Sequence, residues 1–290
     1  MTQAADPDSA LTAADHRLAM TAHVLECLVG LGPTMLLDDE TVARVRALAS
    51  DLAAQLVAGE AALADPVRDR LMANRAIALH LHAIAIETRL IAQLAARRAL
   101  DPVLPPLIRR RLDAGTVGDD VAIATTALLA VQTRLGQSLR RMCLPLGELP
   151  GDLLHMAHAI ADGVRAEHAA PVRHPRHAAP DDPHGRLALL RRVLTVLGPD
   201  TAMALRIDEA GVPLFLSALA LASGQPRELV TLACAEDDPL RLALMLRATG
   251  LSPADAAAQL LAIRPEADPA LVALPADAGA AEHVLAGQGG

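Results

Sequence analysis

The sequence predicts an all-α protein, a helical bundle or HEAT-like solenoid of stacked antiparallel helices with no β-sheet. Apolar residues recur at helical spacing along most of the chain, and no stretch shows the apolar–polar alternation of a half-buried strand. Asp-Pro and Ser-Pro pairs, which favour helix starts, alternate with glycines, which favour helix ends. Phe215 is the only aromatic residue, so the core must consist of closely packed aliphatic helices.

The punctuation of the first half predicts an N-terminal helical domain over residues 1–168. Asp and Pro residues mark the expected starts, and the break in the longest stretch falls at Asn74, the only Asn. Helices are expected at residues 12–29, 39–58, 65–98, 107–112, 120–142 and 149–168.

Residues 169–185 predict a linker, because they are rich in Pro, His and Ala and have no apolar periodicity. Beyond them, short helices are expected at residues 186–197, 201–209, 213–223, 227–235, 240–249 and 254–263. Helices of about ten residues are marginal alone, so residues 186–265 predict an array of mutually supporting hairpins. Residues 266–290 are expected to be mostly a flexible tail.

The C-terminal array contains a repeated pattern. Leu219–Ala233 and Leu244–Ala262 each show an apolar helix end, a Gly, a Pro within three residues and then an amphipathic helix. Such repetition is typical of stacked helical arrays.

Three segments of the chain resemble a known family. They are IAQLAARRALDPVLPPLIRRRL (Ile91–Leu112), VQTRLGQSLRRMCLPLGELPGDLLHMAH (Val131–His158) and the C-terminal FLSALALASGQPRELVTL with ALMLRATGLSPADAA. They are similar to an uncharacterised alphaproteobacterial family, domain of unknown function 2336, described as helical-repeat-like. The resemblance covers roughly residues 65–263. It implies the helical-repeat fold, and it implies no activity, catalytic residue or cofactor.

The amino-acid composition limits the kinds of partner that the protein can bind and the cell compartment in which it is expected. The net charge is −8 and the chain has no Lys, so a phosphate-binding or polybasic membrane surface is not expected. Without Trp or Tyr, base stacking is nearly unavailable. Cys27, Cys143 and Cys234 lie far apart, which fits a reducing compartment. An acidic N-terminus and interrupted apolar stretches predict neither a signal peptide nor a membrane helix. We therefore expect a cytoplasmic protein that binds neither nucleic acid nor membrane.

Two clusters could bind a metal. His155, His158 and Asp162 share one helix face, where they could ligate an ion or handle protons. The alternative is a polar face on which Asp162 supports His158 at i,i+4 spacing. In the first expected helix, His23 and Cys27 have the same spacing, and the alternative there is ordinary packing with Cys as filler.

Arginine clusters are candidate partner contacts, since the guanidinium binds carboxylate and phosphate at two points. Arg109, Arg110 and Arg111 form one cluster, and Arg140 and Arg141 end an expected helix. If these clusters converge, they could bind an acidic or phosphorylated protein. The alternative is a solvated surface on which each Arg pairs with a nearby acid.

No catalytic motif and no cofactor motif is recognised, so we expect a non-catalytic protein without a cofactor. The leading interpretation is a protein–protein interaction or regulatory adaptor module, with homodimerisation left open. The alternative is a metal- or small-ligand-responsive regulator that uses the His clusters. An enzyme of unrecognised type would show a closed pocket with converging Asp, His and Arg.

Overall fold

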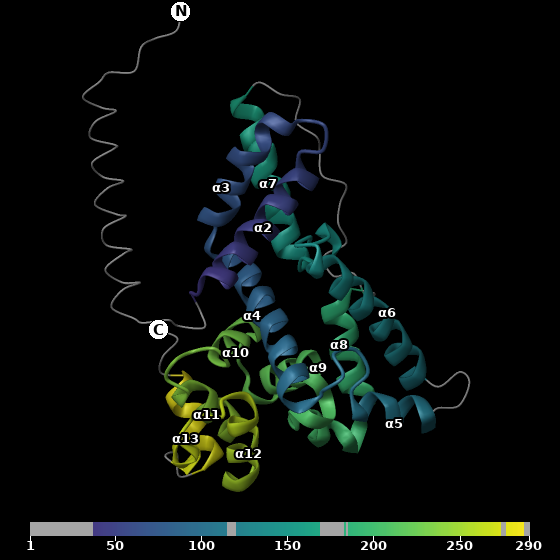
Figure 1. Cartoon of the computed structure of the whole chain (residues 1–290), viewed down its shortest axis with the longest axis vertical. Coiled ribbons are helices and arrows are strands. Elements are labelled where there is room, and N and C mark those ends of the chain that lie inside the picture. The colour runs from purple at the N-terminus through teal and green to yellow at the C-terminus, as the bar shows by residue number, and fades with distance from the viewer. Residues whose placement is uncertain (1–36, 115–119, 169–182, 184, 274–276, 287–290) are drawn as a thin grey trace, which may run out of the picture.

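The computed structural model describes residues 37–114, 120–168, 183, 185–273 and 277–286. All regular structure in these residues is helical, which confirms the all-α class (Figure 1). The α-helices are α2 (Asp39–Leu56), α3 (Ala64–Ala73), α4 (Arg75–Arg98), α5 (Pro106–Ala114), α6 (Asp120–Arg140), α7 (Gly151–Glu167), α8 (Arg186–Val196), α9 (Ile207–Ser223), α10 (Arg227–Ala233), α11 (Leu240–Ala248), α12 (Pro253–Ile263) and α13 (Ala278–Ala286). Short 3₁₀ helices are η1 (Ala61–Leu63), η2 (Leu146–Glu148), η3 (Gly198–Leu205) and η4 (Pro269–Ala273).

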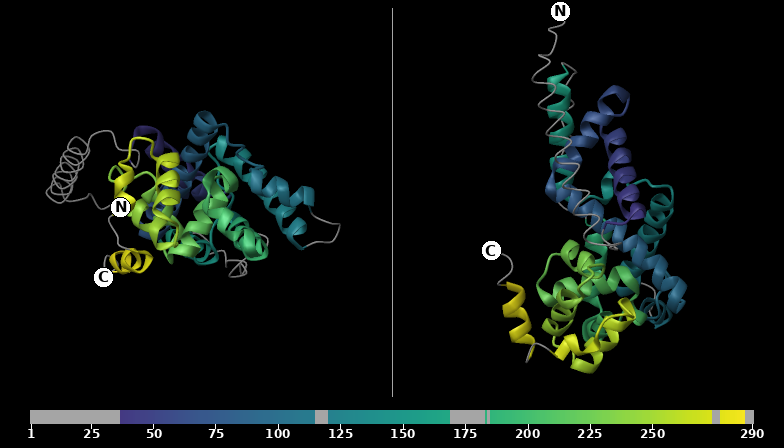
Figure 2. Two further views of the ribbon diagram at one scale, coloured as in Figure 1. Left: turned by 90° about the horizontal axis from the view of Figure 1, so that it is seen from below. Right: turned by 60° about the vertical axis from the view of Figure 1, so that its left-hand side comes forward.

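Within the described residues, the helices build two hydrophobic cores. The first core joins α2, α3 and α7 at one end of the molecule, and the second joins α5 and α8–α13 at the other (Figures 1 and 2). Helix α4 belongs to both, with Ile77 and Leu81 in the first core and Leu90 and Leu94 in the second. Helix α6 is also shared: its first half packs in the second core and its second half in the first.

Three helices from the predicted N-terminal domain, α4, α5 and α6, contribute to the core that contains the C-terminal array. Helices α4 and α6 reach both cores because of their length: α4 has 24 residues and α6 has 21, so each extends about 30 Å or more. The division into domains of residues 1–168 and 186–265 stays a prediction.

Helix ends mostly follow the predicted signals. The break at Asn74 separates α3 from α4, and the Asn74 side chain accepts from the amides of Ala76 and Ile77, both at 3.1 Å. Gly224 and Gly250 end α9 and α11 with φ of 65° and 81°, the left-handed conformation that glycine tolerates best. The two turns of the repeated pattern are thus alike, while regular solenoid stacking stays a prediction.

Two expected elements differ in the structure. Residues 198–205 form the 3₁₀ helix η3 in place of an α-helix over 201–209, and Thr201 Oγ1 donates to the carbonyl of Gly198 at 2.6 Å, a local bond that competes with helical pairing. The expected flexible tail contains α13, which packs against α11 and buries Ala281 and Leu285. Their i,i+4 spacing places both side chains on one apolar face of the helix, which the prediction of a flexible tail did not take into account.

Helix α4 has the length and apolar composition of a membrane-spanning helix, and 56% of its apolar stretch is buried within the fold. The bent pair α9 and α10 passes the same test when taken together. A buried core helix of a soluble protein meets these criteria as well.

Candidate functional site

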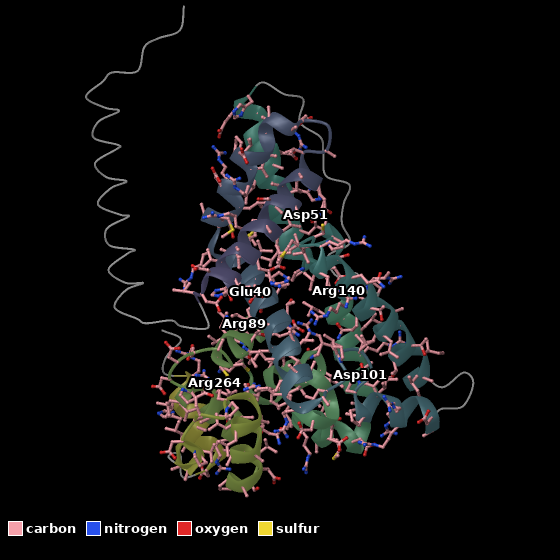
Figure 3. The ribbon with its side chains drawn as sticks, in the orientation of Figure 1. Glu40, Asp51, Arg89, Asp101, Arg140 and Arg264 are labelled. Atoms are coloured by element: carbon pink, nitrogen blue, oxygen red, sulfur yellow. The ribbon has the colours of Figure 1, made fainter. Side chains whose placement is uncertain are left out.

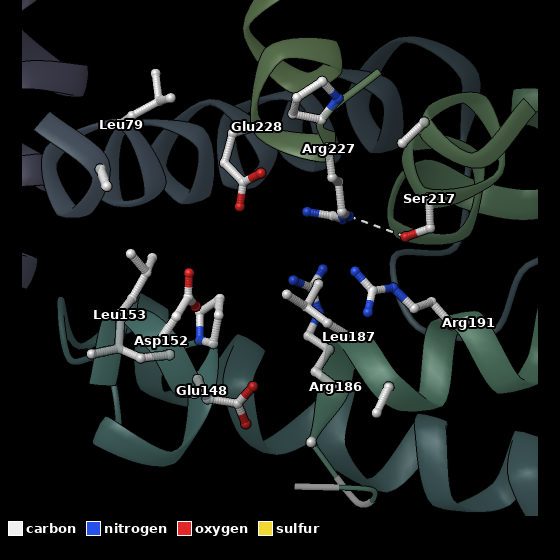
Figure 4. Close-up of a pocket in the computed structure, with 18 of the residues that line it drawn as sticks. Leu79, Glu148, Asp152, Leu153, Arg186, Leu187, Arg191, Ser217, Arg227 and Glu228 are labelled. Atoms are coloured by element: carbon white, nitrogen blue, oxygen red, sulfur yellow. Dashed lines mark hydrogen bonds between the residues drawn. The ribbon is translucent and has the colours of Figure 1, made fainter. Parts of the chain in front are cut away.

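A groove opens where the two cores meet. It is lined by α4, by η2 and the start of α7, by α8, by α9 and by the turn into α10 (Figure 4). Its volume is about 790 Å³, within the usual range for ligand pockets. Because segments from both cores form its walls, a bound group would contact both halves of the molecule at once.

A buried cluster of one acid and two bases lies beneath the groove. Glu87 of α4 is 3% exposed and accepts from Arg227 at 3.0 and 3.1 Å, and from Arg186 at 3.3 Å and through a second, shorter contact. Burial would raise the pKa of Glu87, but the charges of Arg186 and Arg227 outweigh it and hold the pKa at about 2. The cluster joins α4, α8 and α10 and keeps one net positive charge.

Neutral side chains fix the direction of both guanidiniums. Arg227 Nε donates to Ser217 Oγ at 3.0 Å, the bond drawn in Figure 4, and Arg186 Nε donates to Gln132 Oε1 at 2.8 Å. Each arginine therefore donates from three nitrogens, which fixes the orientation of its guanidinium beside the groove.

His80 and Glu228 form a second buried pair next to this cluster. The His80 Nδ1 lies 2.9 Å from Glu228 Oε1, and this hydrogen bond lowers the pKa of Glu228 despite its burial. His80 is 6% exposed, and its Nε2 has no hydrogen-bond partner among the described residues. A small cavity in front of His80 is also lined by Arg186 and Arg227, which line the groove too.

Three helices begin at the groove. Helices α7, α8 and α10 start at Gly151, Arg186 and Arg227, and none receives a side-chain hydrogen bond from its N-cap residue. Pro150, Gly185 and Pro226 occupy the N-cap positions and have no side-chain acceptor. The first turns of these three helices therefore line the same groove.

Aliphatic side chains form much of the remaining wall. Leu79 of α4 is 39% exposed and Leu221 of α9 is 67% exposed, and both line the groove. Leu153 and Leu187 contribute from α7 and α8. Exposed leucines beside a concave surface are typical of sites where a partner covers apolar area.

The predicted cluster on α7 does not form a metal site. His155 is exposed, His158 is half-buried, and Asp162 accepts from Arg165 Nη1 at 2.8 Å. Burial lowers the pKa of His158, and the charges of Arg165 and His155 lower it further against the effect of Asp162. No three His, Cys, Asp or Glu side chains within the described residues are placed to hold a metal ion.

Asp162 instead helps to hold a buried arginine. Arg165 is 2% exposed and donates to Glu60 at 2.9 Å and to the Leu56 carbonyl at 2.5 Å as well as to Asp162. These contacts tie α7 to the end of α2. The other predicted metal pair, His23 and Cys27, lies outside the described residues.

The predicted arginine clusters do not converge on an empty concave face. On α5, Arg110 pairs with Glu209 at 2.7 Å, Arg111 with Asp200, and Arg109 lies 3.9 Å from Asp101. These three arginines therefore fit the alternative prediction of a solvated surface, because each lies beside an acidic residue of this chain.

Arg140 and Arg141 are exposed at the far end of α6, a helix of 21 residues whose beginning follows α5. Figure 3 shows Arg140 well apart from Asp101, the residue that faces Arg109. The two clusters thus occupy separate places and cannot contact one ligand group together.

The buried ionic cluster beneath the groove was not predicted from the sequence, although its acid carried a signal. Glu87 lies among the buried Ile84, Ile86 and Leu90, so it interrupts the apolar face of α4. An acid on such a face implies a buried partner. The partners themselves, 99 and 140 residues away, have no signature in the sequence.

Comparison with family models, with curated proteins and with solved structures finds no match to this chain.

Proposed function

We propose that the protein is a non-catalytic interaction module of the cytoplasm that holds a segment of a partner protein in the groove between its two cores. The observation that carries the proposal is the open, partly aliphatic groove with Leu79 and Leu221 exposed at it. Its partner is a segment with aliphatic side chains and an acidic group, since leucines and arginines line the same groove.

The walls of the groove are held in a fixed arrangement by ion pairs and hydrogen bonds. Glu87 with its two arginines and the Arg227–Ser217 bond position the walls before anything binds. A site that is already ordered loses little conformational entropy on binding. Helical-repeat character, as in the resemblance described above, would suit such a role, because stacked helices present extended concave surfaces.

Site-specific photo-crosslinking in the host cell tests the proposal. A photoreactive residue replaces Leu221 in one variant and Ile123 in a control, because Ile123 is also an exposed aliphatic residue, at 51%, and does not line the groove. We expect an adduct with one protein from position 221 and none from position 123. A peptide of the crosslinked segment should bind the purified protein, and Leu79→Arg should abolish both results.

Two outcomes would overturn the proposal. Equal adducts from both positions would mean that the groove binds the partner no better than the rest of the surface does. An adduct between two copies of this chain at position 221 would assign the groove to a homodimer.

A small-ligand-responsive regulator is the second candidate function. The groove volume favours it, since pockets of several hundred Å³ commonly hold small molecules. Native mass spectrometry of the protein isolated from its host would show a retained small molecule if the protein is such a regulator. It would show a bound protein partner if the protein is an interaction module.

A further inference from the structure

His80 lies at the junction of the two cores, beside the groove. It comes from α4, the helix that both cores share, and it lines a cavity of about 10 Å³. Glu228 of α10 and Glu148 of η2 line both this cavity and the groove, and Figure 4 shows these two acids on opposite walls of the groove. Because α10 packs in the second core and η2 packs against the first, the cavity of His80 has an acid from each side.

Within the described residues, one of the two nitrogens of the His80 ring has a hydrogen-bond partner. Nδ1 lies 2.9 Å from Glu228 Oε1, and this hydrogen bond lowers the pKa of Glu228, so Glu228 is ionised at neutral pH and Nδ1 is the donor. In the neutral ring Nε2 is then an acceptor, buried without a partner, which costs free energy. In the doubly protonated ring Nε2 is a donor, and the cavity supplies an acceptor, the carboxylate of Glu148.

The charges around the cavity favour the protonated ring. Arg186 of α8 and Arg227 of α10 also line the cavity, but both donate to Glu87 of α4. Together with Glu148 and Glu228, these residues supply three carboxylates and two guanidiniums, so one further positive charge balances them. The remaining lining residues are apolar, and a cavity of this size holds one water at most. A charged ring therefore depends on the carboxylates rather than on solvent.

We propose that His80 is a proton-dependent clasp between the two cores. Its doubly protonated ring binds Glu228 through Nδ1 and Glu148 through Nε2, and its neutral ring keeps the contact with Glu228 alone. Since the imidazole side chain changes charge between about pH 5 and 8, the clasp is complete at the acid end of this range and loses its Glu148 contact as the pH rises. Both acids belong to the groove walls, so the complete clasp draws the two walls toward α4. The inference rests on the proposed function, because it names how pH regulates the groove that holds the partner.

Nitrogen–proton NMR spectra of the histidine rings test the clasp, because they report the protonation of each ring nitrogen. The purified full chain is titrated between about pH 5 and 8, the range in which imidazole changes charge. We expect both nitrogens of His80 to carry a proton at the acid end. The backbone amides of Leu149 and Leu187, which line the groove beside α7 and on α8, should change with the same midpoint as the ring.

Substitutions on either side of the ring identify its partners. Glu148→Gln should move the His80 midpoint about one pH unit lower, since a neighbouring carboxylate favours the charged ring. Asp152→Asn is the matched control and should leave the midpoint in place, because Asp152 is an exposed acid that lines the groove but not the cavity of His80. His80→Gln should remove the pH dependence of the two groove amides. His155→Gln should retain it, because His155 is exposed on α7 and does not line the groove.

A His80 ring that stays neutral over the whole range would overturn the clasp, and so would equal midpoints in Glu148→Gln and Asp152→Asn or groove amides that do not follow the ring. The Glu148→Gln titration decides the question even if His80→Gln does not fold. Because the titration involves no partner, its failure would remove the clasp and leave the crosslink from position 221, and with it the interaction module, standing. A titration as expected without any adduct would support the clasp and remove the interaction module.

Discussion

Glu87 and Arg227 lie 140 residues apart in the chain and form a two-point ion pair, with oxygen–nitrogen distances of 3.0 and 3.1 Å. The pair connects the long helix α4 to the start of the short helix α10. With Arg186, it forms a buried ionic contact at the junction of the two cores. Stability and groove shape therefore depend on the same three side chains.

Replacing the shared acid should be strongly destabilising. Glu87→Gln leaves two guanidiniums close together in a buried site, and breaking a buried pair typically costs about 3–5 kcal/mol. Urea denaturation at pH 7 measures the change in the free energy of unfolding. Glu40→Gln is the control, because Glu40 is 66% exposed in its pair with Arg44 and should change stability by less than about 1 kcal/mol. Similar small changes in both variants would show that the buried cluster contributes little.

Stability should fall in acid through the same residue. The folded pKa of Glu87, about 2, lies below the ordinary value of 4.5, so the folded state binds this proton less readily than the unfolded state. The contribution is fully present above about pH 4.5 and is lost as the pH falls toward 2. Denaturation curves between pH 6 and 2 should show a decline that is smaller in Glu87→Gln. Parallel declines in the two proteins would assign the acid sensitivity to other groups.

Gly211 should not tolerate a side chain. Its φ of 68° falls in the left-handed region, and an added Cβ would lie 3.2 Å from Pro105 Cβ. Gly211→Ala should therefore lower the free energy of unfolding by about 1–3 kcal/mol. The same change at Gly136, inside α6 with nothing within 4 Å, should raise it by about 0.5–1 kcal/mol. Thermal melts of both variants measure these opposite signs, and a loss at both positions would contradict the backbone argument.

The two cores should unfold together because they share α4 and α6. Leu52→Ala in the first core and Phe215→Ala in the second each remove a fully buried side chain, at costs of about 2–5 and 3–5 kcal/mol. Each variant should shift one common transition when circular dichroism and amide hydrogen exchange are followed in urea. A biphasic curve in which each substitution moves only one phase would show that the cores unfold independently.

Local signals predicted most helices of this chain, and long-range contacts decided the rest. Asn74 and Gly224 were predictable because capping and the left-handed turn depend on a few neighbouring residues. The sharing of α4 and α6 between the two cores was not predicted, because composition marks a segment such as residues 169–185 but not which distant helices pack together. The first turns of α7, α8 and α10 line one groove, and His80 lies in a small cavity beside it. This arrangement depends on contacts between distant segments, which no local pattern in the sequence predicts.

The sharing of α4 and α6 also bears on how the chain can be divided. A cut of the chain between His168 and Gly185 would leave the second half of α4 and the first half of α6 with uncovered leucines, and would leave α8 and α9 without the surface they bury. Each fragment would expose the surface against which the other fragment packs in the intact chain. We therefore expect the two fragments to be unstable when separate and to complement each other when mixed, because each supplies surface that the cores of the other need.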